Sequence, residues 1–94
     1  MVKFEWDENK NQTNIQKHGI SFEEAITVFK DMDALIISDE NHSDDEDRFL
    51  LIGYSSKANL LVVCHCYRLN DAVIRIISAR KGNKEDRNLY LTQK

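Results

Sequence analysis

Three apolar runs in the second half of the chain, joined by short links, constrain the fold more than any other feature. The runs extend from Arg48 to Tyr54, from Leu60 to Arg68 and from Ala72 to Arg80. Links this short join antiparallel neighbours, because a parallel pair needs a crossover of a dozen or more residues. The runs therefore predict an antiparallel meander. The last two are apolar on both faces over much of their length, so both faces need a cover.

The N-terminal segment predicts one short strand followed by a polar helix. Residues 2–6 alternate with period two, which is typical of a strand, and Asp7 follows as a helix N-cap. The helix should run to about Lys17 and end at Gly19, whose freedom to adopt positive φ suits the C′ position. Three residues share one face of this helix at i, i+4 and i+7: Asn11, Ile15 and His18.

A second helix begins at Ser21, where Ser21 and Glu24 form a capping box. Its apolar stripe must pack on a sheet and consists of Phe22, Ala25, Ile26 and Phe29. A β-rich run follows at residues 34–38, and Asn83 caps a final helix with Glu85 and Asp86 in its first turn. Residues 1–94 are thus expected to form a single α+β domain, a small antiparallel sheet flanked by helices in the order β-α-α-β-β-β-β-α.

Acidic and basic residues are unevenly distributed along the chain. Residues 1–46 carry 4 Lys and Arg against 12 Asp and Glu, a net charge of −8, whereas residues 47–94 carry 9 against 4, a net charge of +5. A basic surface confined to one half attracts polyanions such as RNA, although the formal charge of the whole chain is −3. The alternative is that the two halves neutralise each other on the surface.

The residue types that bind metals are not arranged for that purpose. Cys64 and Cys66 would project from one face of a strand and His65 from the other, so we expect packed, reduced thiols and no metal or other cofactor. The acidic stretch at residues 39–47 is expected to be a solvated loop. It lacks the glycine and terminal glutamate spacing of an EF-hand calcium loop.

Two arginines near strand ends are the strongest candidates for a phosphate site. Side-chain alternation assigns Arg68 to one apolar row, with Leu60, Val62, Cys64 and Cys66, and Arg80 to another, with Ile74, Ile76 and Ser78. Because both rows start apolar and end cationic, the two guanidinium groups are expected to converge on one anionic pocket, with Lys81 beside them. The alternative is that each arginine pairs with a carboxylate at its strand end.

His18 is a candidate for proton transfer, because a histidine at a helix C-terminus is stabilised in its charged form and titrates near neutral pH. The alternative is a structural role beside Gly19. No apolar run reaches the roughly 18 residues needed to span a membrane, and the first residues lack the apolar stretch of a signal peptide. We therefore expect a cytoplasmic protein that makes no membrane contact.

Several long phrases of this sequence resemble the BrnT family of bacterial toxins, in the order in which that family has them. They are Phe4 to Asp7, Lys17 to Ala25, Val28-Phe29, Arg48 through Gly53, Leu60 to Arg68, and Ile74 to Lys81 followed by Glu85. The resemblance implies the toxin of a type II toxin-antitoxin system, with a fold similar to the RelE ribonucleases. It further implies a metal-independent endoribonuclease in which a ribose 2′-hydroxyl attacks the adjacent phosphate, so that translation and growth are inhibited.

The resemblance also implies roles for particular residues. Arg68 and Arg80 would stabilise charge in the transition state, His18 would transfer the proton, and Glu85 would position Arg80. The residues that it implies for substrate binding are Lys81, Lys17, Arg48, Tyr54 and Trp6, although core packing is an equally plausible role for the two aromatic side chains. The implied partners are RNA and an antitoxin with a ribbon-helix-helix domain. The toxin would contact DNA only through this antitoxin. The rival hypothesis is a non-catalytic module that binds an antitoxin for autoregulation.

Overall fold

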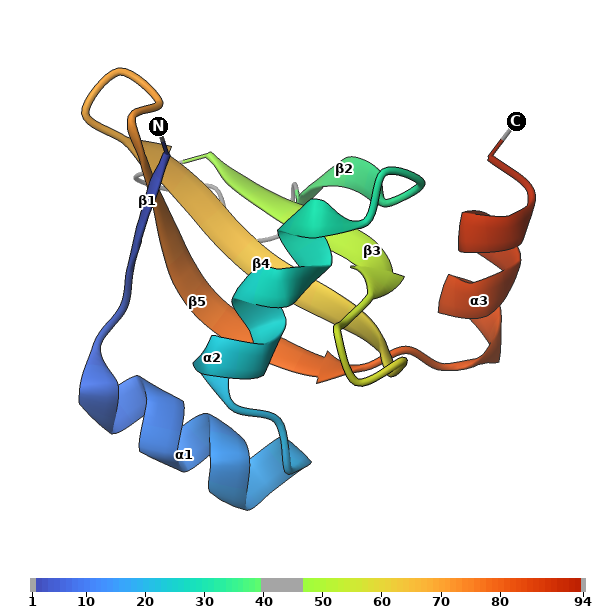
Figure 1. Cartoon of the computed structure of the whole chain (residues 1–94), viewed down its shortest axis with the longest axis horizontal. Coiled ribbons are helices and arrows are strands. Elements are labelled where there is room, and N and C mark those ends of the chain that lie inside the picture. The colour runs from blue at the N-terminus through green and yellow to red at the C-terminus, as the bar shows by residue number, and fades with distance from the viewer. Residues whose placement is uncertain (1, 40–46, 94) are drawn as a thin grey trace.

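The structure, a computed structural model, describes residues 2–39 and 47–93. It confirms the predicted α+β class and order of elements and adds a 3-10 helix, η1, directly after the second α-helix (Figure 1). The elements are β1 (Lys3–Glu5), α1 (Glu8–His18), α2 (Phe22–Ala25), η1 (Ile26–Lys30), β2 (Leu35–Asp39), β3 (Arg48–Tyr54), β4 (Leu60–Arg68), β5 (Val73–Lys81) and α3 (Lys84–Leu91). The greater part of the predicted acidic loop, residues 40–46, lies outside the described residues.

The sheet has the strand order β1-β5-β4-β3-β2. Strands β3 to β5 form the predicted antiparallel meander, and β2 extends it by pairing antiparallel with β3. β1 pairs with β5 in parallel, so the sheet is mixed. The parallel pair arises because the chain leaves β1 through the helices and the whole meander before it returns beside β1, and a crossover of that length permits parallel pairing.

A β-bulge changes which face of the sheet the end of β5 presents. Cys64 pairs with Ser78 and His65 pairs with Ile76, so Ile77 is an extra residue on β5. Beyond the bulge, Ser78 and Arg80 therefore project from the face opposite to Ile76. The predicted row that joined the two isoleucines to Arg80 is wrong, because simple alternation does not count the bulged residue.

The two faces of the sheet are covered differently. One face, which we call the α2 face, packs under α2 and η1 (Figure 1). Its core is composed of Ile20, Phe22, Ala25, Val28, Leu51, Leu61, Val63, Ile74, Ile76 and Ala79, and Ile26 and Phe29 pack against it as the stripe predicts. The other face, which we call the α3 face, is covered at one end, where Tyr90 of α3 packs near Ile52, Leu60 and Val62.

Helix α1 has the predicted caps, but only one residue of its predicted shared face is buried. Asp7 accepts hydrogen bonds from the N–H groups of Asn9 and Lys10, and Gly19 has a φ of 71°. Asn11 and Asn14 are buried, whereas Ile15 is 37% exposed and His18 is exposed. Asparagine tolerates burial at both positions because each side-chain amide is hydrogen-bonded.

The Asn14 amide forms hydrogen bonds with the edge of β5 of the kind that a neighbouring strand would form. Its Oδ1 accepts from the Ala79 N–H at 3.1 Å and its Nδ2 donates to the Ala79 carbonyl at 2.8 Å. The same Nδ2 also donates to the Ile20 carbonyl at 2.8 Å. β1 pairs with β5 only from Val73 to Arg75, so this amide satisfies backbone groups further along the edge and fixes α1 beside β5.

The expected capping box at the start of α2 is half present. The Ser21 hydroxyl accepts from the Glu24 N–H at 3.0 Å, as predicted. The Glu24 carboxylate instead accepts from the Ser55 hydroxyl at 2.7 Å and from the Asn59 amide at 2.8 Å. Glu24 therefore links α2 to the turn between β3 and β4.

Both cysteines are free and buried, as predicted, and His65 lies on the opposite face from them. His65 is fully buried against the Phe29 ring, with ring centroids 4.9 Å apart. Its Nδ1 lies 3.1 Å from the Val63 carbonyl and its Nε2 lies 3.3 Å from the Tyr67 hydroxyl. A neutral imidazole satisfies both contacts, and burial lowers the pKa of His65.

The buried His65 should make the free energy of unfolding depend on pH below neutrality. In the unfolded chain His65 binds a proton near pH 6.5, and in the folded chain it does so only at lower pH. The contribution of His65 to stability is therefore constant above about pH 6.5 and falls by up to about 1.4 kcal/mol per pH unit below it. Urea unfolding at pH 7.5, 6 and 5 measures this loss. His65→Gln should remove it, whereas the matched exchange His18→Gln should keep it. The same pH dependence in both variants would contradict the prediction.

Candidate functional site

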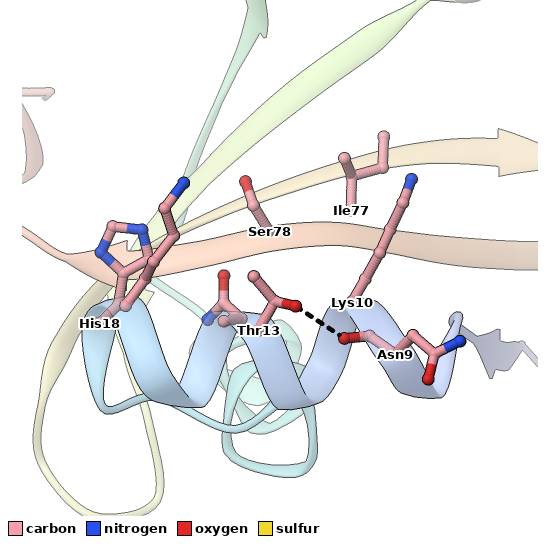
Figure 2. A pocket seen from close by; sticks show the side chains of 8 residues that line it. Asn9, Lys10, Thr13, His18, Ile77 and Ser78 are labelled. Carbon is pink, nitrogen blue, oxygen red and sulfur yellow. Dashed lines mark hydrogen bonds between the residues drawn. The ribbon is translucent and has the colours of Figure 1, made fainter.

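A groove of about 280 Å³ runs between α1 and the outer edge of β5. Its lining is made by Asn9, Lys10, Thr13, Asn14, Lys17, His18, Ile77 and Ser78. Figure 2 shows Lys10 and His18 near the two ends of the helix, with Thr13 between them and with Ile77 and Ser78 contributed by the strand behind. Two elements that are distant in the sequence thus form one concave site.

Helical spacing explains why the basic side chains share this groove. Lys17 follows Lys10 by two helical turns, and His18 is the next residue. Asn14 lies between them on the same side and bonds to Ala79, so the face that carries Lys10 and Lys17 is held against β5. Lys10 and His18 are about 12 Å apart along the helix axis.

The chemistry of the groove suits an anion. Its lining provides two ammonium groups, an imidazole, two hydroxyls and two amides, and none of the eight lining residues is acidic. The Thr13 hydroxyl donates to the Asn9 carbonyl at 3.0 Å, so it is already oriented by the helix. A phosphate in the groove would meet cationic donors and no opposing carboxylate on its walls.

Arg80 lies next to this groove. It follows Ser78 by two residues on the same face, a distance of about 7 Å along an extended strand. Its Nη1 donates to Asp86 Oδ2 at 2.7 Å and to the Lys81 carbonyl at 3.2 Å. Burial opposes ionisation of Asp86, but hydrogen bonds from Arg80 and from the Asn83 N–H hold the pKa of Asp86 below its usual range. Asp86, and not the predicted Glu85, therefore contacts Arg80.

The predicted convergence of Arg68 with Arg80 is wrong. Arg68 pairs with Val73 and Arg80 pairs with Val62, so the two arginines are six residues, or about 20 Å, apart along β4. The physical reason is that antiparallel strands end at opposite ends of their hairpin. Each arginine instead has a carboxylate partner, which was the stated alternative.

At its own end of the sheet, Arg68 shares a carboxylate with Arg75. Both Nη1 atoms donate to Glu5 Oε2, Arg68 at 2.5 Å and Arg75 at 2.9 Å. Hydrogen bonds from Arg75 and then from Arg68 hold the pKa of Glu5 below its usual range. This cluster connects the short β1 to the hairpin of β4 and β5.

The other predicted site residues lie away from the groove. Lys81 pairs with Leu61 on the α2 face, opposite to Arg80, and Arg48 pairs with Asp39 at the far side of the sheet. Neither contributes to the lining of the groove.

The two aromatic candidates have packing roles. Trp6 packs edge-on against the Phe22 ring, with centroids 6.1 Å apart, and its Nε1 donates to Glu8 at 3.2 Å. Tyr54 packs edge-on against Tyr90 at 5.3 Å. The structure thus brings Lys17 and His18 together, with Arg80 beside them.

Sequence reasoning missed Lys10, Thr13 and Asp86. Lys10 could have been found from its spacing to Lys17. An interval of seven residues places both lysines on one side of any helix that spans them. The contact of Asp86 with Arg80 had a weaker signal, the Asn83-x-x-Asp86 spacing of a capping box.

Comparisons with known proteins agree with this architecture. The family described as the ribonuclease toxin BrnT of a type II toxin-antitoxin system matches residues 6–86. The crystal structure of the Brucella abortus ribonuclease toxin BrnT, solved at 1.1 Å, is similar with a TM-score of 0.69 and 26% sequence identity, over 89% of this chain and 100% of that one. No curated protein matches the sequence. The matched family region includes every lining residue of the groove, Arg80 and Asp86.

No helix within residues 2–39 and 47–93 is long and apolar enough to cross a membrane. In the same ranges, no three His, Cys, Asp or Glu side chains are grouped so that they could hold a metal ion.

Proposed function

The chain belongs to the BrnT family of ribonuclease toxins of type II toxin-antitoxin systems, and from this premise we propose that it cleaves RNA without a metal ion in the groove between α1 and β5. One observation carries the proposal. Lys10, Lys17 and His18 line a single groove whose walls bear no carboxylate, and Arg80 lies beside it. Such a groove attracts phosphate and would repel Mg²⁺.

The reaction that fits these residues uses the RNA itself as the nucleophile. The ribose 2′-oxygen bonds to the adjacent phosphorus and gives its proton to a base, while the bond from phosphorus to the 5′-oxygen breaks and that oxygen takes a proton from an acid. The products are a cyclic phosphate and a 5′-hydroxyl. The protein then has to supply proton transfer and positive charge, and no step needs an oxidant or a cofactor.

We assign His18 to proton transfer, because imidazole is the side chain lining the groove that most often serves as a general acid or base. Lys10 and Lys17 bind the RNA backbone, and Arg80 stabilises charge on the phosphorane. Arg68 cannot reach the same phosphate across about 20 Å, so we leave it, with Lys81, Arg48, Tyr54 and Trp6, outside the reacting site.

Family membership implies an antitoxin partner as well as an RNA substrate. We propose that this antitoxin carries a ribbon-helix-helix domain, that DNA is contacted only through it, and that free toxin acts in the cytoplasm, where cleavage of RNA slows translation and growth. A fold of the RelE type is consistent with the helices and mostly antiparallel sheet described here.

The test is to incubate purified protein with total RNA in excess EDTA and to map the new ends. Products with 5′-hydroxyl and cyclic phosphate ends are expected. Cleavage only after Mg²⁺ is added, or products with 5′-phosphates, would contradict the proposal. The rival function, a non-catalytic module, predicts intact RNA together with normal antitoxin binding.

A further inference from the structure

We infer that Asp86 is a positioning residue for Arg80, and that it turns the Nε–Nη2 edge of the guanidinium toward the scissile phosphate. The inference rests on the proposed function and assigns a role to a residue of α3 that touches neither RNA nor the groove.

Both hydrogens on Arg80 Nη1 have acceptors within the protein. One points to Asp86 Oδ2, 2.7 Å away, and the other to the Lys81 carbonyl, 3.2 Å away. An arginine carries five N–H donors, so three remain, one on Nε and two on Nη2. Within residues 2–39 and 47–93 no hydrogen bond uses these three, and the Arg80 side chain is 42% exposed.

The remaining donors are the ones that recognise a phosphate. Nε–H and one Nη2–H are parallel and lie on one edge of the planar group, a spacing that fits two oxygens of the same phosphate. With Nη1 fixed, the plane of the guanidinium is fixed too. The second edge is therefore held ready before any RNA binds, which reduces the ordering cost of binding.

Asp86 is itself held rigidly by the start of α3. Its Oδ2 accepts from the Asn83 N–H at 2.9 Å, and the Asp86 N–H donates to Asn83 Oδ1 at 2.9 Å, which completes a capping box. The Asp86 side chain is only 11% exposed. The carboxylate is thus positioned by helix backbone, and its charge selects a cationic partner.

The neighbouring residue provides a matched control. Glu85 carries the same charge in the same helical turn but is exposed, and the carboxylate that pairs with Arg80 is that of Asp86. If replacing Asp86 lowers the cleavage rate and replacing Glu85 does not, the loss is due to the contact with the guanidinium and not to the general charge of α3.

The first experiment compares cleavage kinetics of Asp86→Asn, Asp86→Ala and Glu85→Gln at equal folded fraction, judged by circular dichroism and thermal unfolding. Asp86→Asn keeps an acceptor for the Asn83 N–H and removes the charge. We expect kcat to fall by about 10- to 100-fold in both Asp86 variants, with KM changed less than threefold, and no change for Glu85→Gln.

The second experiment uses chemical rescue, which a purely structural role would not affect. Free guanidinium ion should restore part of the activity of Arg80→Gly, because Asp86 can still bind the cation in the vacated space. The double variant Arg80→Gly, Asp86→Asn should lose at least tenfold of that rescue. Urea at the same concentration controls for denaturation.

Failure of the positioning role and failure of the proposed function give different results. An Asp86→Asn protein that cuts RNA at the normal rate, or equal rescue of the single and double variants, would overturn the positioning role alone. Wild-type protein that leaves RNA intact would overturn the proposed function and this inference with it.

Discussion

Replacing Arg80 with alanine should lower the rate of RNA cleavage by about 10²- to 10³-fold, the usual effect of removing one preorganised donor to a developing oxyanion. Arg80 lies about 7 Å along β5 from Ser78, a lining residue of the groove, and its guanidinium is fixed by Asp86. The measurement is single-turnover cleavage of a short RNA in EDTA. The substitution leaves a mostly buried carboxylate without its cation, so the folded fraction has to be verified first.

Arg68→Ala provides the contrast for this prediction. Arg68 lies at the opposite end of the hairpin and shares Glu5 with Arg75, so its removal should change cleavage less than threefold. Equal losses from both substitutions would show that both arginines act on one phosphate, and the groove would then be the wrong site.

His18→Gln should lower the cleavage rate by about 10²- to 10⁴-fold, the range typical of general acid-base catalysis. Glutamine keeps a hydrogen-bonding side chain at the end of α1 but cannot transfer a proton near neutral pH. The measurement is the cleavage rate from pH 5 to 9. The wild-type rate should depend on pH, and the residual rate of the variant should lose that dependence.

Lys17→Gln is the matched neighbour for the His18 prediction. It removes a positive charge from the adjacent residue of the same groove, so it should raise KM and weaken the salt dependence of binding while the pH dependence of the rate stays intact. If Lys17→Gln abolished the pH dependence and His18→Gln did not, proton transfer would have to be reassigned to Lys17.

The parts of the fold that depend on local signals could be predicted from the sequence. Asp7 and Gly19 bound α1 because a side-chain acceptor and a residue with positive φ are needed at those two positions. β3 and β4 begin and end at the residues where their apolar runs do. The α+β class followed from the order of these elements, and the family followed from long phrases in a fixed order.

What could not be predicted depends on pairing between distant segments. The parallel partner of β1 is set by how the whole chain returns, and no residue of β1 specifies it. The prediction that Arg68 and Arg80 converge failed because both arginines lie near the C-terminal ends of their strands. In an antiparallel pair, those two ends lie at opposite ends of the hairpin. Half of the groove was predictable, since Lys17 and His18 are basic neighbours on one helix, but the strand that forms the other wall was not.

The extra residue Ile77 has a consequence for which changes in chain length this protein can tolerate. Deleting Ile77 would remove the bulge and restore strict alternation, and Arg80 would stay on the α3 face, because three steps would then separate it from Ile76. Relatives that lack one residue between Ile76 and Ser78 should therefore still present an arginine at this position on the α3 face.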